Sequence, residues 1–265
     1  MSTEDLRHQY AGNGFHPLDA LVEITYVWDG TGLRSVVGPD IEFDYAIASH
    51  VIEHVPDVIG WLNDILSVLK PGGIVALAVP DRRYTFDVRR PVTTMGQLLE
   101  HFLSKRRKPG PEQIFDHFSQ VVKVSHIDIH GLVRRDLDID ALERHHTDEE
   151  ALDLAMASLG PDAHYRDRHA SVFTPKSFLE LLAQMVGLGL LPAELAEFYS
   201  TEHVAIEFFA TLRKADLDKD ARKQESERIR CLAQTLTDER DDWRQIRQGV
   251  LAEQTQKKSR MRLFR

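Results

Sequence analysis

The segment Phe43–Asp81 reads FDYAIASHVIEHVPDVIGWLNDILSVLKPGGIVALAVPD, and it decides the fold. Tyr45–Ala48 and Ile74–Val79 are short apolar runs of the kind that forms buried strands. Between them, apolar residues recur at the spacing of one helical face, at Ile59, Leu62, Leu66 and Leu69. A strand, a helix and a second strand in this order imply two parallel strands with the helix on one face of the sheet.

The ends of this unit are also marked in the sequence. Pro56 prevents a helix from running through the segment before it, so we expect the helix to begin near Asp57. Pro71 and the pair Gly72-Gly73 end the helix and turn the chain into the second strand. The loops after Ser49 and after Pro80 then lie at the same edge of the sheet, where ligands of parallel α/β sheets bind.

Length and composition narrow the classes of protein. The chain has 265 residues, 42% of them hydrophobic, which is enough for one sizeable core with additional segments. The net charge of −9 argues against a nucleic-acid-binding surface. Cys231 is the lone cysteine, so the sequence predicts neither an internal disulfide nor a thiolate metal site. We expect a soluble, cytoplasmic protein, because we find no bilayer-spanning apolar run and no signal-peptide pattern.

Three pieces of the segment together resemble a known family. They are Phe43-Asp44 before the first strand, Glu53-His54 after it, and Leu69–Gly73 before the second strand. In this order and spacing they resemble the second half of a class I S-adenosylmethionine-dependent methyltransferase of the type 11-like group. The resemblance covers residues 20–87 and 174–213. It implies an α/β fold with an incomplete Rossmann-like sheet, mostly parallel with an antiparallel last pair, and S-adenosyl-L-methionine as cofactor.

The family binds its cofactor mainly with a glycine-rich turn after the first strand and an acidic residue after the second. Glycine permits close backbone approach, and the carboxylate accepts the ribose hydroxyls. Neither feature is found before Phe43: Gly12-Asn13-Gly14 follows a polar segment and is interpreted as a plain loop. We therefore expect an N-terminally truncated or degenerate methyltransferase that alone binds S-adenosylmethionine weakly or not at all.

The run Leu21–Trp28 is similar to the third strand of the family fold. The resemblance then makes Asp29, in the turn with Gly30, a contact for the adenine amino group, and the alternative is an ordinary strand-ending Asp-Gly turn. In the family the first strand lies between the second and the fourth. Tyr45–Ala48, the fourth-strand equivalent, would therefore have an open edge, unless Leu21–Trp28 pairs there.

The rest of the chain divides into three parts. Residues 88–165 are expected to be a helical insertion, with helices over Thr93–Phe102 and Arg134–Leu159. Thr174 is expected to cap a helix that begins at Pro175, and two strands, Leu195–Ser200 and Val204–Leu212, follow as the antiparallel last pair. We place the methyltransferase-like domain at residues 1–214 and a charged helical segment at residues 215–265.

Residues 229–250 carry a short heptad pattern, which predicts either a coiled coil forming a homodimer or a single solvated helix. Its apolar positions are Ile229, Leu232, Leu236, Trp243, Ile246 and Val250. A second feature, the basic cluster Lys105–Lys108, is either a solvated helix end or a site for an acidic acceptor.

The candidate site residues follow from the resemblance and from residue chemistry. The backbone of Ala48 and Ser49, with His50, is expected to face the cofactor. His54, Asp81 and His169 are candidate catalytic residues. His169 stands out among the insertion's histidines because it precedes the Phe173-Thr174-Pro175 helix start, in a loop that could cover the site, and a histidine can take a proton from a hydroxyl.

Three functions remain open. The first is a methyltransferase acting on a small molecule or a sugar-type hydroxyl of a carbohydrate. The second is an inactive methyltransferase-like fold that serves as an interaction module. The third is a zinc hydrolase, because His50, Glu53 and His54 match a His-x-x-Glu-His pattern. The pattern directly follows a strand, and Pro56 stops a helix from running through it, so we expect no metal there.

Overall fold

In the computed structural model, residues 2–11, 18–28, 30–124, 139, 142–160, 167–202 and 205–236 are described. The predicted strand–helix–strand unit is confirmed: β1 (Phe43–Ser49), α3 (Val58–Ser67) and β2 (Leu69–Pro80) follow one another, and β1 pairs with β2 in parallel. The predicted boundary at Pro71–Gly73 is wrong, because α3 already ends at Ser67 and Leu69 pairs with Phe43 as the first residue of β2. Asp57 caps α3, because its carboxylate accepts a 2.8 Å hydrogen bond from the Gly60 N–H.

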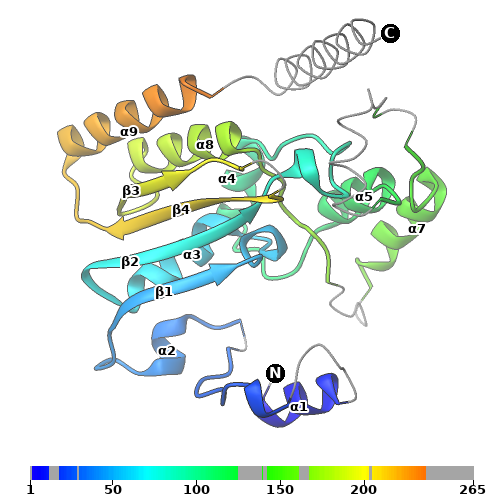
Figure 1. Ribbon diagram of the computed structural model, residues 1–265, viewed down its shortest axis with the longest axis horizontal. Helices are drawn as coiled ribbons and strands as arrows, with labels where there is room; N and C mark the ends of the chain where they lie inside the picture. The colour runs from blue at the N-terminus through cyan, green and yellow to red at the C-terminus, as the bar shows by residue number, and fades with distance from the viewer. Residues whose placement is uncertain are drawn as a thin grey trace, which may run out of the picture.

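The sheet has the strand order β1-β2-β4-β3 (Figure 1). β3 (Ala193–Tyr199) and β4 (Glu207–Lys214) form the predicted antiparallel pair, and β4 also runs antiparallel to β2. This is the predicted α/β fold with an incomplete Rossmann-like sheet. The carboxyl ends of β1 and β2 meet at one edge, beside the start of β4.

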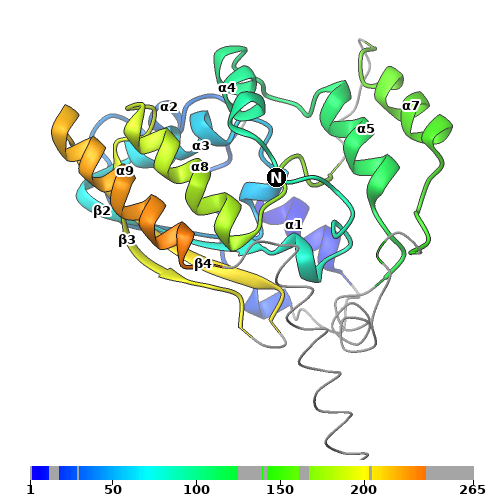
Figure 2. The same cartoon turned by 90° about the horizontal axis from the view of Figure 1, so that it is seen from above.

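The core lies between one face of the sheet and a layer of helices. Figures 1 and 2 show α3, α8 (Pro175–Gly187) and α9 (Lys219–Gln234) on the same side of the sheet. Their buried apolar residues pack on those of β2 and β4. The opposite face exposes Tyr45, Ile47, Tyr199 and Phe209, which the strand register places on that same face. One face of the sheet is therefore covered and the other is not, among the described residues.

Thr174 caps α8 as predicted. Its hydroxyl accepts a 3.1 Å hydrogen bond from the Ser177 N–H, and Ser177 Oγ accepts one of 2.8 Å from the Thr174 N–H. This reciprocal arrangement is a capping box, and Pro175 fits the first turn because its missing N–H would have no helical partner.

The predicted strand at Leu21–Trp28 is wrong. These residues are described and form no strand, and Val22 is 79% exposed. A strand needs a neighbouring strand to accept its backbone hydrogen bonds. Here the Ile24 N–H donates to a side chain instead, the hydroxyl of Thr3 in α1 (Thr3–Tyr10), at 2.8 Å. β1 is therefore an edge strand in the described sheet. A short helix, α2 (Leu33–Val37), leads into it.

The insertion contains α4 (Met95–Leu103), α5 (Pro111–Gln120) and α7 (Asp148–Ala157). The predicted helix over Arg134–Leu159 is wrong at Leu142–Thr147, which is not helical, because Thr147 caps α7 through a capping box with Glu150. Residues 134–138, 140 and 141 lie outside the described residues. The helix predicted over Thr93–Phe102 is confirmed as α4.

α9 belongs to the segment expected to be a charged helical tail. Ile229 and Ala233 are buried against the core, and Leu232 and Leu236 pack partly against it. Ser226 also donates a 2.7 Å hydrogen bond to the Ala183 carbonyl of α8. Trp243, Ile246 and Val250 lie outside the described residues, so the homodimer through 229–250 stays a prediction.

Candidate active site

Three loops meet at the carboxyl ends of β1 and β2. One follows β1, the second follows β2, and the third is the segment Asp167–Thr174 before α8. Backbone hydrogen bonds join them: the Glu53 carbonyl accepts from the Ala170 and Ser171 N–H groups at 2.6 and 3.0 Å, and the Arg82 N–H donates to the Phe173 carbonyl at 2.9 Å. The third loop therefore brings His169 to the edge where β1 and β2 end.

His169 is held by a buried carboxylate. Its Nδ1 bonds to Asp87 Oδ2, and Asp87 Oδ1 accepts a 2.9 Å hydrogen bond from Arg90 Nη1. Arg90 also donates to the His169 carbonyl at 2.9 Å and to Asp116 at 2.7 and 2.9 Å. Burial alone would raise the pKa of the Asp87 carboxyl, but Arg90 and His169 together hold that pKa below its usual range. Asp87 is therefore ionised and fixes the tautomer of His169.

Glu53 and His54 lie against the same ring. Glu53 is 2% exposed, and neither of its carboxylate oxygens has a hydrogen-bond partner. Burial raises the pKa of the Glu53 carboxyl, and its own backbone N–H first, and the nearby histidines second, oppose that shift. His54 Nε2 lies 3.6 Å from Glu53 Oε1, and the His54 ring meets the His169 ring edge-on, with centroids 4.8 Å apart. Two predicted catalytic residues, His54 and His169, thus come together.

Asp81, the third predicted catalytic residue, is fully buried. Its carboxylate accepts hydrogen bonds from Arg83 Nη2 at 2.7 Å and from the Thr201 hydroxyl at 2.7 Å. Arg83 Nε adds a further bond at 3.0 Å. This network fixes the beginning of the loop that carries Asp87, so we interpret Asp81 as a positioning residue.

The predicted cofactor residues are divided between two places. Ser49 and His50 end β1, and Ala48 is buried on the core face. His50 adopts a left-handed backbone conformation (φ 53°), and its Nε2 bonds to Glu207 of β4. Gly30 instead lines a separate cavity, and Asp29 lies outside the described residues.

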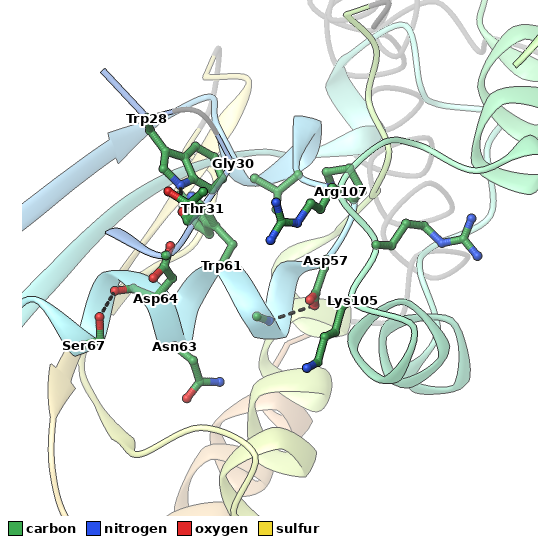
Figure 3. A pocket seen from close by; sticks show the side chains of 15 residues that line it. Trp28, Gly30, Thr31, Asp57, Trp61, Asn63, Asp64, Ser67, Lys105 and Arg107 are labelled. Atoms are coloured by element: carbon green, nitrogen blue, oxygen red, sulfur yellow. Dashed lines mark hydrogen bonds between the residues drawn. The ribbon is translucent and has the colours of Figure 1, made fainter. Parts of the chain in front are cut away.

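That cavity has a volume of about 410 Å³ and lies along α3 (Figure 3). Trp28, Thr31 and Trp61 lie on one side of it, and the basic side chains of Lys105 and Arg107 lie on the other. Residues Val55–Asp57, which follow the loop after β1, also line this cavity. The size suits a small-molecule ligand, and the basic cluster lies at its wall, so an acidic ligand there stays a prediction.

The geometry of the His-x-x-Glu-His pattern differs from that of a zinc peptidase. Only Ile52–His54 forms a single 3₁₀ turn, and His50 precedes it in the left-handed conformation. The two histidines therefore do not share a helical face, and His50 is directed to Glu207. A different trio, Glu53, His54 and His169, offers metal-ligand atoms that all lie within 4.8 Å of one another.

The sequence-based reasoning missed Asp87, Arg90 and His117. His117 is buried beside this network, and Arg90 Nη1 lies 3.5 Å from its Nδ1. Burial first, and the neighbouring Arg90 second, lower the pKa of His117 to about 3. The sequence held one signal for this pair: an acidic and a basic residue, Asp87 and Arg90, stand at i and i+3 in the loop that follows a predicted strand. Of the other insertion histidines, His126, His130 and His164 lie outside the described residues.

The parallel strands, with a polar cluster at their carboxyl ends, define an α/β protein of the Rossmann-like class. The sequence model of a family described as a methyltransferase domain matches residues 5–191. The chain therefore belongs to the class I S-adenosylmethionine-dependent methyltransferases. The search of curated proteins and the search of solved structures each found no match. Among the described residues, no helix is both long and apolar enough to cross a bilayer.

The described residues do not form a complete pocket for S-adenosylmethionine. In residues 2–11, 18–28 and 30–124, no glycine-rich turn follows a strand beside β1, and no carboxylate ends such a strand. Gly12-Asn13-Gly14 lies outside the described residues. What the described residues do supply is the end of β1 and the polar cluster beside it.

Proposed function

We propose that the protein methylates a hydroxyl group of a small molecule or a sugar-type acceptor, and that His169 takes up the proton of that hydroxyl. The observation that carries this proposal is the His169–Asp87 pair at the carboxyl ends of β1 and β2. The family's cofactor supplies a methyl group on a sulfonium, which is already a good leaving group. The protein's task is then to align the acceptor and to receive its proton.

Asp87 prepares His169 for this role. Because Nδ1 of His169 bonds to Asp87, the other ring nitrogen, Nε2, carries the lone pair of the neutral ring. The ionised carboxylate also stabilises the imidazolium that forms when Nε2 takes the proton. Arg90 holds Asp87 in place, so that the carboxylate cannot rotate away from the ring.

The other predicted residues have supporting roles in this proposal. His54 packs edge-on against His169 and orients its ring. Asp81, through Arg83, positions the loop that carries Asp87. Ser49 and His50, at the end of β1, face the cofactor side.

We also infer that this chain alone binds S-adenosylmethionine weakly, with a dissociation constant in the millimolar range or above. The support is the incomplete pocket and the free edge of β1. Calorimetric titration of the folded chain with S-adenosylmethionine tests this inference. Micromolar binding would contradict it and would mean that other segments or a second copy complete the pocket.

The activity itself is tested by methyl transfer from labelled S-adenosylmethionine, at millimolar concentration, to a panel of sugars and hydroxylated small molecules. His169→Gln should lower the transfer rate by about 10²- to 10⁴-fold, the usual contribution of a general base. His8→Gln, which changes an exposed histidine of α1, serves as the matched control. Transfer that is equal in the wild type and in His169→Gln would rule out the assigned base.

A second function, an inactive interaction module, is favoured by one observation. The uncovered face of the sheet presents Tyr45 and Ile47, which are 62% and 73% exposed, next to the free edge of β1. Folded protein that transfers no methyl group to any acceptor, even at high cofactor concentration, would favour this function over the enzyme.

A further inference from the structure

We propose that Glu53, His54 and His169 form a binding site for a first-row transition-metal ion, with zinc as the representative ion. Each residue offers one ligand atom, and these atoms lie within 4.8 Å of one another. Two imidazoles and one carboxylate form a ligand set suited to zinc and to neighbouring divalent metals. The proposal concerns metal binding and does not rest on methyl transfer.

The first supporting observation is that a carboxylate lies against the outer nitrogen of each histidine. His169 Nδ1 bonds to Asp87, and His54 Nδ1 lies 2.7 Å from Oδ1 of the exposed Asp167, an ion-pair contact without hydrogen-bond geometry. Metal-binding histidines commonly carry such a carboxylate on the nitrogen that does not bind the metal. In both residues this leaves Nε2 as the ligand atom, and His54 Nε2 already lies 3.6 Å from Glu53 Oε1.

The second observation is the state of Glu53. Its side chain is 2% exposed, and its carboxylate oxygens make no hydrogen bond to another residue. Oε1 has only long contacts, at 3.6 Å to His54 Nε2 and 3.7 Å to His50 Nδ1. A buried carboxylate with such weak partners is costly. A bound cation next to His54 and His169 would supply a strong one.

The third point is the fit of the distances. Zinc binds nitrogen and oxygen ligands at about 2.0–2.2 Å, so its tetrahedral ligands lie about 3.4 Å apart. The present separations exceed this by at most about 1.4 Å, which small rotations of the histidine rings would close. Three protein ligands leave the fourth position of the ion open.

Metal and proton would compete for the same group. His169 Nε2 is the atom to which we assign the acceptor's proton, and a metal ion bound there occupies its lone pair. The metal-bound form would therefore be unable to use His169 as a base. This competition links the two proposals, but the metal site can be tested without any acceptor.

The test is calorimetric titration of the chelator-treated full chain with zinc chloride, repeated with Mg²⁺. We expect one zinc ion per chain in the micromolar range or tighter and no comparable binding of Mg²⁺, which prefers oxygen ligands. Co²⁺ bound in place of zinc should show the visible absorption of a site with nitrogen ligands. Absence of stoichiometric zinc binding to folded protein would overturn the proposal.

Four variants and a control test the site. Of these, His169→Ala should weaken zinc binding at least about tenfold. His54→Ala and Glu53→Gln should each weaken zinc binding at least about tenfold, and Asp167→Asn should weaken it about tenfold through its contact with His54. His54 is 27% exposed in its side chain, so its replacement should leave the fold intact, which circular dichroism would check. His146→Ala, at a histidine outside the trio, is the control and should bind zinc like the wild type.

His50→Ala separates this site from the His-x-x-Glu-His pattern. His50 Nδ1 lies 3.7 Å from Glu53, but its Nε2 is directed to Glu207, so this variant should keep the wild-type affinity for zinc. Equal loss in His50→Ala and His54→Ala, with none in His169→Ala, would assign the metal to the pattern instead and overturn the trio.

Discussion

The His117 ring is buried in the insertion, where it contacts the rings of Phe86 and Phe118 edge-on. Its pKa is lowered to about 3 by burial and by Arg90, whereas an unfolded histidine has a pKa near 6.5. Between these two values the unfolded chain binds the proton and the folded chain does not. The free energy of unfolding therefore falls as the pH is lowered from about 6.5.

We expect this single group to cost about 2 kcal/mol of stability between about pH 7 and about pH 5. His117→Phe keeps a ring between Phe86 and Phe118 and cannot titrate, so it should remove most of that part of the pH dependence. Urea unfolding at several pH values measures the effect. His8→Phe, at an exposed histidine, should leave the wild-type slope unchanged; equal slopes in wild type and His117→Phe would contradict the prediction.

The individual residues of the site show where sequence reasoning stops. His54 and His169 could be selected because histidine chemistry and loop position are visible in the sequence. The role of Asp87 could not, since charged residues in loops are exposed by default and only the folded chain shows that Arg90 and His169 surround it. Glu53, Asp87 and His169 come from three loops, and nothing local in the sequence specifies that they meet.

Among the elements, α8 was predictable because its start is encoded locally. Thr174 with Ser177 forms the cap, and Pro175 follows at the first turn. Leu21–Trp28 has an equally strand-like pattern, but it forms no strand because strand formation depends on a distant neighbour. Local signals thus predicted the starts of α3 and α8, although the cap at Thr147 was missed. Signals that depend on pairing predicted only the strands whose partners are present among the described residues.

The cap of α8 gives a direct stability prediction. Thr174→Ala removes the oxygen that accepts from the Ser177 N–H and should lower the free energy of unfolding by about 1 kcal/mol. Thr174→Ser keeps the hydroxyl and is the matched variant. Chemical unfolding should show the loss for alanine and a much smaller change for serine; similar losses for both would assign the effect to the buried methyl group instead.

Among the residues that the structure describes, β1 has a free edge and an uncovered face, and these predict self-association. Exposed apolar edge strands pair with other chains, and Ile47 is 73% exposed on β1. Ile47→Lys should lower the concentration-dependent increase in mass measured by sedimentation, while leaving thermal stability nearly unchanged. Val22→Lys is the control, because it places the same charge at an apolar residue that is 79% exposed but lies outside the sheet. An equal effect of both variants would point to general charge repulsion.

At the scale of the whole molecule, α9 decides whether the folded core extends beyond Lys214. The composition after Lys214 predicted a separate charged segment. A helix with few buried positions consists mostly of exposed residues, and most of these are charged, so its composition hides the buried ones. Yet Ile229 and Ala233 are almost fully buried, and Arg228 pairs with Glu225 beside β3. The Leu195 N–H donates to Glu225 at 2.8 Å, which ties the helix to the sheet.

If α9 is part of one cooperative unit, its buried contacts must stabilise the sheet as well. Ile229 is 0% exposed, and deleting such a side chain to alanine typically costs about 2–5 kcal/mol. Ile229→Ala should therefore lower the unfolding midpoint of the entire chain, followed both by helical circular dichroism and by tryptophan fluorescence, since Trp61 lies in α3 on the same side of the sheet. Arg230→Ala, at an exposed neighbour, should change neither signal. Loss of helical signal at lower denaturant, with the tryptophan transition unmoved, would show instead that α9 unfolds as a separate segment and that the core ends near Lys214.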